Sequence, residues 1–269
     1  MTATGYAAGA LVAYIVMVVV NFLANAVPIA GRTSAQISDS YANLFAPAGF
    51  TFAIWGVIYI LLGFHVAWQL GLGRPKQSAV SERAKVLVAK LFIASSALNA
   101  AWIVAWHDKI IWLSLVLILG MLLLVGKAAM VLADQKIGMR EGVLTSLPFS
   151  VYFAWLTVAT IANVTTWLVS VGWDGGGIRA DIWTVGVLTF GFVIGAAITW
   201  RLRDGTYSAV LAWAYWGILA KHLPTGAWHG KYELVIGALA ALVPLLVILT
   251  LTMFYTNFAK LKIDGSIRG

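Results

Sequence analysis

Long apolar segments recur along the whole chain, and they constrain its fold more than any other feature of the sequence. A helix needs roughly 20 mostly apolar residues to cross a bilayer. The segments that approach or exceed this length are residues 5–27, 48–72, 85–106, 109–132, 143–169, 181–200, 206–222 and 232–257. Strands of a membrane barrel would be about half as long and would alternate apolar with polar residues. The sequence therefore predicts an all-α integral membrane protein with eight spans. Because the seventh segment is short and rich in aromatic residues, seven spans is an open alternative.

Charged residues are too few to cover a surface exposed to water. They make up 10% of the chain and hydrophobic residues 61%, whereas about a quarter of a soluble domain is charged. The net charge of +8 comes from Lys and Arg in short stretches between the apolar segments. Basic residues at such positions usually set the orientation of a membrane protein, and this explanation is favoured over nucleic-acid binding. The absence of cysteine from the sequence excludes disulfides, thiolate catalysis and cysteine-bound metals.

Basic residues follow alternate apolar segments and predict the orientation in the membrane. The stretches after the second, fourth and sixth segments contain Arg74, Lys76, Arg83, Lys85, Lys136, Arg140, Arg201 and Arg203. By the positive-inside rule these stretches are cytoplasmic, so both termini lie inside and residues 28–47 face outward. Residues 24–26 resemble a signal-peptide cleavage site, but the apolar run before them is long and lacks a basic start, which favours a retained helix. We expect a multi-pass protein of a bacterial inner membrane.

The acidic residues argue against several kinds of chemistry. Every Asp and Glu lies at or near an end of a predicted helix. Ion-coupled pumps usually keep a carboxylate inside the bundle, and paired-carboxylate catalysis or a carboxylate-bridged metal needs two such groups together. No nucleophile–base pair or metal-ligand spacing is visible either. The sequence predicts no catalytic residue and no metal site, and an enzyme is the less favoured class.

Aromatic residues form a stripe along the second predicted span. Phe52, Trp55 and Tyr59 share one helix face, and His65 and Trp68 continue it. Because the stripe runs inward from the membrane surface, it suggests the interior of a bundle and makes Phe52 and His65 candidate ligand-binding residues. Simple helix packing explains such a stripe equally well, and a hydrogen-bonded interior group is the alternative role for His65.

Two further spans place side-chain amides among tryptophans. Asn99 precedes Trp102 in the third span, and Trp155 and Asn163 lie broadly on one face of the fifth. An asparagine is costly in hydrocarbon unless it finds a partner, so both amides should point inward. They serve either interhelical hydrogen bonding or a small-molecule pocket, which combines apolar walls with a few polar groups.

Three blocks of residues, in this order along the chain, resemble the TspO/MBR family of tryptophan-rich sensory proteins, which are related to the translocator protein. The matching residues are Tyr41, Leu44, Pro47, Trp55 and Tyr59, then Leu98, Asn99 and Trp102, then Trp155, Ala159, Thr160, Asn163 and Trp167. The resemblance covers about residues 5–170. The chain departs from the family pattern at Pro47, where the family has two prolines, and at Pro148, which lies further upstream of Trp155 than the pattern has it.

This resemblance implies a TspO-like five-helix bundle over residues 1–175, with residues 176–269 as a three-helix membrane extension. Members of the family bind tetrapyrroles, and some bind sterols, in a cavity capped by the first loop. Carried over to this chain, the family pattern implies ligand-binding roles for Trp55, Tyr59, Asn99, Trp102, Trp155 and Asn163. It implies a lid formed by Tyr41, Leu44 and Pro47.

The leading interpretation is a membrane protein that binds a hydrophobic planar molecule, such as a porphyrin, for sensing, regulation or transport. The resemblance requires no cofactor and allows a bound porphyrin or haem. Expected partners are the lipid bilayer, the small-molecule ligand and a second copy of the chain, and no nucleic acid. Two alternatives stay open: an alternating-access transporter unrelated to tetrapyrroles and a membrane enzyme that modifies a tetrapyrrole.

Overall fold

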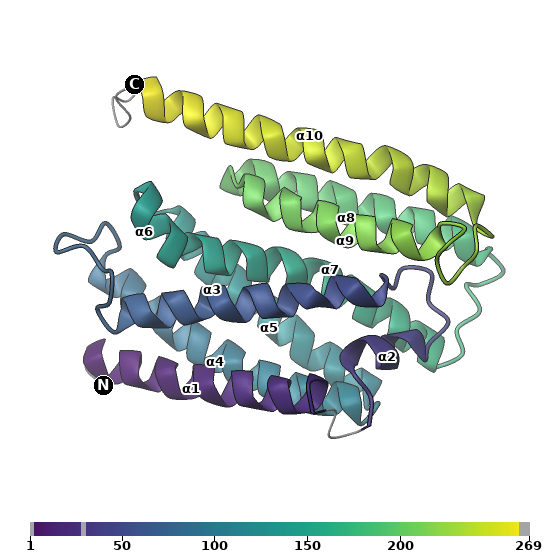
Figure 1. Cartoon of the computed structure of the whole chain (residues 1–269), viewed down its shortest axis with the longest axis horizontal. Helices are drawn as coiled ribbons and strands as arrows, with labels where there is room; N and C mark the ends of the chain where they lie inside the picture. Colours follow the sequence, from purple (N-terminus) through teal and green to yellow (C-terminus); the bar gives the residue numbers. More distant parts are fainter. Residues whose placement is uncertain (1–2, 28–30, 264–269) are drawn as a thin grey trace.

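The computed structural model describes residues 3–27 and 31–263, which form helices joined by loops (Figure 1). The helices are α1 (Ala3–Asn25), α2 (Ser34–Asp39), the 3₁₀ turn η1 (Gly49–Ala53), α3 (Ile54–Gln69), α4 (Glu82–His107), α5 (Ile111–Ala133), α6 (Met139–Leu144), α7 (Ser146–Ser170), α8 (Ala180–Leu202), α9 (Gly205–His222) and α10 (Glu233–Ile263). No strand occurs within the described ranges, and the all-α prediction is confirmed. The predicted loop 28–47 and the predicted extension 176–269 each include some residues outside these ranges.

Among the described residues, eight helices of 16 or more residues lie side by side (Figure 1). In the described part of the chain, seven helices, with η1 counted as the start of α3, are long and apolar enough to cross a membrane. The eighth, α9, has 18 residues and ends in Lys221 and His222. It packs against α7, α8 and α10, so it needs little apolar surface towards lipid. The start of α1 and the end of α10 lie at the same end of the bundle, as an even number of passages requires (Figure 1).

Hydrogen bonds between side chains join four helices in the apolar interior. Asn99 on α4 is fully buried and accepts a hydrogen bond from Asn21 Nδ2 on α1 at 2.7 Å. Its own Nδ2 donates to the Tyr152 hydroxyl on α7 at 3.0 Å. That hydroxyl in turn donates to Met121 Sδ on α5 at 3.5 Å. Asn99 therefore makes the interhelical hydrogen bonds that one interpretation of its sequence position proposed.

The last three long helices pack together. Two of them, α8 and α9, contact α7, and α9 also contacts η1. Figure 1 shows α8, α9 and α10 as one group, with α7 between this group and the remaining helices. The hydroxyl groups of Tyr207 on α9 and Thr157 on α7 lie 2.6 Å apart, and Tyr215 donates to the Leu188 carbonyl of α8 at 2.7 Å. The division of the chain at residue 175 stays a prediction.

A glycine allows α9 to approach η1 closely. A Cβ atom added at Gly217 would lie 2.8 Å from Thr51 Cγ2 and closer still to Thr51 Oγ1. Thr51 is fully buried, so its side chain cannot turn towards solvent to make room for an added Cβ. Helices in a bilayer gain little from apolar burial against each other and depend on such close approaches.

Replacing Gly217 with alanine should therefore destabilise the protein by about 1–3 kcal/mol, the usual cost of an overpacked site. The matched control is Gly186→Ala on α8, where an added Cβ meets nothing within 4 Å. That change should be neutral, or stabilising by up to about 1 kcal/mol through helix propensity. The measurement is thermal unfolding in detergent. Thr51→Ala should restore stability to the Gly217 variant, and equal midpoints for the two glycine variants would contradict this account.

Candidate functional site

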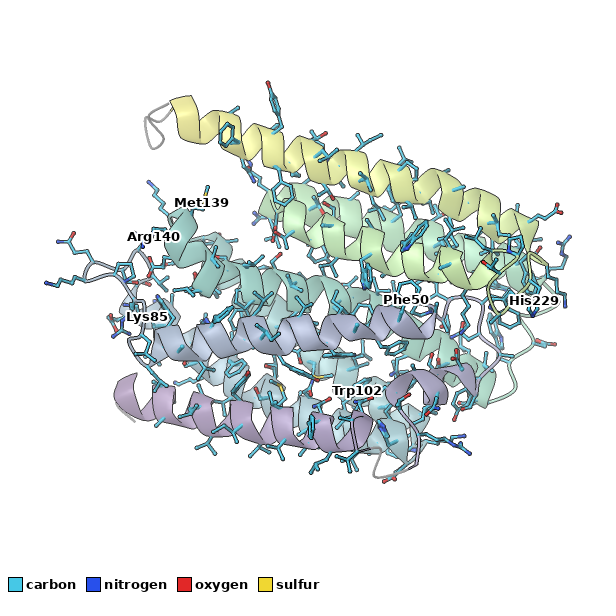
Figure 2. All side chains as sticks on the ribbon, in the orientation of Figure 1. Phe50, Lys85, Trp102, Met139, Arg140 and His229 are labelled. Atoms are coloured by element: carbon cyan, nitrogen blue, oxygen red, sulfur yellow. The ribbon has the colours of Figure 1, made fainter. Side chains whose placement is uncertain are left out.

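Aromatic rings from α3, α4 and α7 meet in one cluster around Trp55. The Trp55 ring centroid lies 5.5 Å from that of Trp102 and 6.1 Å from that of Trp155. Tyr59 stacks on Trp55 at 5.8 Å, and Phe52 meets Trp155 edge-on at 6.2 Å. In Figure 2, Trp102 lies among the helices towards the end of the bundle that carries α2. The structure thus brings together rings from three separate spans.

A small cavity lies beside this cluster. Its volume is about 30 Å³, close to the volume that one water molecule takes in the liquid, about 30 Å³. The residues that line it are Ser38, Pro47, Phe52, Trp55, Trp102, Trp106, Trp155, Val158, Ala159, Ala162, Asn163 and Thr166. The rings therefore contact one another around a small space, and a large flat molecule fits between them only if they move apart.

Several polar atoms around the cavity have no hydrogen-bond partner within the described part of the chain. They include the indole nitrogens of Trp102 and Trp155, two of the lining residues. Trp102 is 4% exposed and Trp155 2%, so lipid and bulk water do not reach these N–H groups. A buried donor without a partner costs about 1–3 kcal/mol. An acceptor brought in by a bound molecule would remove this cost.

The segment between α1 and α3 covers one side of the cavity. Ser38 and Pro47 line the space directly. Asn43 Nδ2 donates to Thr165 Oγ1 at 2.7 Å and to Thr166 Oγ1 at 3.2 Å, which ties the segment to α7. Trp106 Nε1 donates to the Ser34 carbonyl at 3.2 Å, which ties it to α4. We call residues 34–48 the lid segment.

Helix α9 holds the lid segment from the other side. The Lys221 ammonium forms an ion pair with the Asp39 carboxylate at the end of α2. The Ala48 amide donates to the Gly217 carbonyl at 3.0 Å, and Trp213 Nε1 donates to the Thr51 carbonyl at 3.2 Å. The Lys221 side chain is 8% exposed and that of Asp39 is 49% exposed. The predicted C-terminal extension therefore contacts the lid segment directly.

Six of the predicted site residues line the cavity, and five do not. Those that line it are Pro47, Phe52, Trp55, Trp102, Trp155 and Asn163. Tyr59 touches the cluster through Trp55, and Asn99 is engaged in the hydrogen bonds described above. Leu44 lies in the lid segment but faces a different hollow. Tyr41 lies beside Lys109, whose Nζ is 5.8 Å from the ring centroid, and burial raises the pKa of the Tyr41 hydroxyl.

His65 belongs to a second, separate group of rings. It is fully buried, stacks on Trp68 at 5.8 Å and meets Phe149 edge-on at 4.8 Å. Its Nδ1 lies 3.2 Å from the Leu144 carbonyl and its Nε2 lies 2.7 Å from Gln69 Nε2. Both ring nitrogens are therefore engaged, an arrangement that does not fit a haem ligand and matches the hydrogen-bonded interior role.

Two larger hollows lie outside the aromatic cluster. One, of about 550 Å³, is lined by the lid segment at Leu44, by α7, by the loop after α7 and by the first half of α8. The other, of about 510 Å³, lies between the ends of α5 and α10 and the α8–α9 turn. Exposed apolar side chains such as Phe190 line the first hollow, so the bilayer itself can fill it.

Sequence reasoning missed several residues of the cluster. Trp106 stacks on Trp102 at 6.0 Å and lines the cavity, and its four-residue spacing from Trp102 was a usable signal. Tyr152 meets Trp55 edge-on at 6.0 Å. Ser38 had no signal, because it comes to the cavity only through the fold of the lid segment.

The comparison with protein families extends the resemblance along the chain. A family model described as TSPO-like protein matches residues 7–254. This range includes α8, α9 and most of α10, which lie beyond the three blocks of residues that resemble the TspO/MBR family. Comparison with curated proteins and with solved structures finds no match. With its apolar spanning helices, the chain is an integral, multi-pass membrane protein, and it belongs to the family of TSPO-like proteins.

Proposed function

We propose that this protein binds a flat, conjugated, hydrophobic molecule of the porphyrin class between the rings of Trp55, Trp102 and Trp155. The observation that carries the proposal is the pair of buried indole N–H groups without partners in the walls of the cavity. A porphyrin offers two things that this cluster lacks, an extended apolar face for the rings and carboxylates as acceptors. Membership of the TSPO-like family supports the same class of ligand.

The cavity as described corresponds to the closed form of such a site. Ligand pockets usually have volumes of about 300–1,000 Å³, and this cavity has about 30 Å³. Binding therefore requires the lid segment to move and the rings to separate. The ring contacts that are lost are replaced by contacts with the ligand, each stacked pair contributing about 0.5–1.5 kcal/mol beyond the buried area.

The lid segment is well suited to such a movement, because a few identifiable polar contacts hold it. Asn43 ties it to α7, and the Lys221–Asp39 pair and the Ala48–Gly217 hydrogen bond tie it to α9. Sensing and transport would both begin with this opening and binding step. Either role can therefore follow from the binding of a porphyrin at this site.

Filling the cavity tests the position of the site. Ala162→Leu adds three carbon atoms to its lining and should weaken protoporphyrin binding by about tenfold or more, as overpacking penalties of about 1–3 kcal/mol imply. The matched control is Ala197→Leu on α8, where the residue is exposed and binding should not change. The measurement is tryptophan quenching during titration of the purified protein. Equal affinities for the two variants would place the ligand elsewhere.

Releasing the lid segment tests the closed-form interpretation. Lys221→Met leaves an unbranched side chain one atom shorter and removes the ion pair, while the half-exposed Asp39 stays hydrated. The variant should bind protoporphyrin several-fold faster in stopped-flow quenching, because opening no longer breaks this pair. Lys127→Met is the control, since Lys127 is exposed on α5. If the two variants associate at the same rate, the ion pair does not hold the lid segment.

A further inference from the structure

A second small hollow lies at the end of the bundle opposite the lid segment. It has a volume of about 30 Å³ and lies between α1, the end of α3 and the start of α4. Its lining residues are Tyr6, Ala7, Trp68, Gln69, Arg74, Glu82, Lys85, Val86 and Ala89. Figure 2 shows Lys85 at this end of the bundle, where α1 also begins. By the positive-inside rule this end is cytoplasmic.

Two cations face the ring of Trp68 in this hollow. The Arg74 guanidinium carbon lies 6.0 Å and the Lys85 Nζ 5.9 Å from the Trp68 ring centroid. Glu82 pairs with Lys85 at 2.8 Å, but its side chain is 75% exposed. Among the ion pairs of the described residues, none involves Arg74. The charged side chains of the lining thus carry one positive charge more than they carry negative charges.

Trp68, which lines the hollow, also carries a buried hydrogen-bond donor. The residue is 1% exposed, and its Nε1 finds no hydrogen-bond partner in the described part of the chain. Stacking on His65 fixes the ring in place. An indole N–H can only donate, so the group that satisfies it must be an acceptor. Beside two cations, the acceptor that fits best is an anion.

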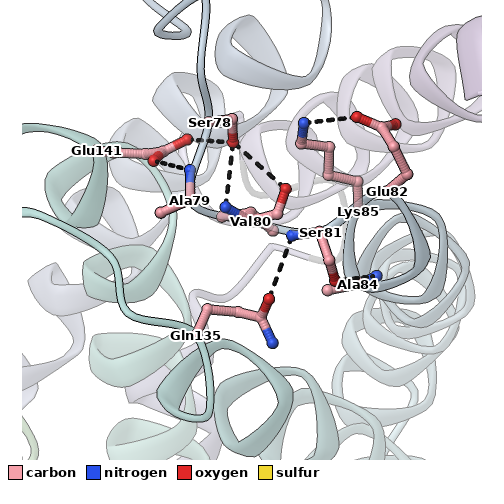
Figure 3. Close-up of polar contacts among 9 residues, drawn as sticks. All are labelled: Ser78, Ala79, Val80, Ser81, Glu82, Ala84, Lys85, Gln135 and Glu141. Atoms are coloured by element: carbon pink, nitrogen blue, oxygen red, sulfur yellow. Dashed lines mark hydrogen bonds and ion pairs between the residues drawn. The ribbon is translucent and has the colours of Figure 1, made fainter.

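Hydrogen bonds hold the segment that leads into α4 and to Lys85 (Figure 3). The buried Glu141 carboxylate accepts hydrogen bonds from Ser78 Oγ at 2.6 Å and from the Ala79 amide at 3.0 Å. Gln135 Oε1 accepts one from the Ser81 amide at 3.2 Å. These contacts tie the start of α4, which carries Lys85, to α6 and to the loop after α5. The position of Lys85 is therefore supported by the protein itself, whereas Arg74 lies in the exposed loop before α4.

We propose that this hollow binds the phosphate group of an anionic phospholipid from the cytoplasmic leaflet. The Arg74 guanidinium presents a planar fork that matches two phosphate oxygens, Lys85 adds a point charge, and Trp68 Nε1 donates to a third oxygen. Basic pockets between membrane helices on the cytoplasmic side are suited to lipid headgroups. The acyl chains would lie along the apolar surfaces of α1 and α3. This site is separate from the aromatic cluster and does not depend on the proposed porphyrin binding.

Native mass spectrometry of the full chain in detergent tests the proposal, with phosphatidylglycerol, phosphatidylcholine and inorganic phosphate as probes. The wild type should bind one phosphatidylglycerol more tightly than phosphatidylcholine. Arg74→Gln with Lys85→Gln should weaken that binding by about tenfold or more, since each direct hydrogen bond to a charged group contributes about a factor of ten or more. Lys76→Gln with Arg83→Gln is the matched control, because it removes the same charge from exposed residues outside the hollow.

A third variant separates specific hydrogen bonding from general charge attraction. Trp68→Phe keeps an aromatic ring and removes the N–H, and it should weaken phosphatidylglycerol binding several-fold without changing the net charge. Equal losses in the two double variants would overturn the proposal. Binding of inorganic phosphate with no preference for phosphatidylglycerol would overturn the lipid assignment and identify free phosphate as the ligand.

Discussion

Buried polar side chains that bond across helices hold this bundle together, and the remaining features depend on them. Apolar contacts alone favour helix association little in a bilayer, because lipid tails are as apolar as leucine. Asn99 therefore carries much of the specificity, since it accepts from Asn21 and donates to Tyr152. These bonds set α1, α4 and α7 in register. That register places Trp102 and Trp155 at the same depth as Trp55.

Helix α9 extends the same principle to the lid segment. Its Gly217 permits the approach of Thr51, and its backbone accepts from Ala48. Its Lys221 reaches Asp39 at the end of α2. The three helices after residue 175 are thus more than an addition to a five-helix bundle. Helices α8 and α9 pack against α7, and α9 contacts the lid segment beside the aromatic cavity, which gives α9 a direct part in the proposed ligand binding.

Much of the fold and part of the site could be predicted from the sequence. Apolar segment length located each long helix to within a few residues, and four-residue spacing with the family blocks identified Trp55, Trp102, Trp155 and Asn163. Periodicity gives the face of a helix but not the neighbours of that face, so it could not show that His65 packs against Phe149 and lies apart from the cluster around Trp55. The Lys221–Asp39 pair joins residues 182 positions apart, and no local pattern indicates such a contact.

Rings from three spans surround the space that we propose opens for a flat ligand. A density map of the protein with protoporphyrin bound would show directly whether it does. We expect density between Trp55, Trp102 and Trp155, with a carboxylate or ring nitrogen near an indole N–H and with Pro47 displaced. Density in the hollow between α7 and α8, with the three indoles still in mutual contact, would contradict it.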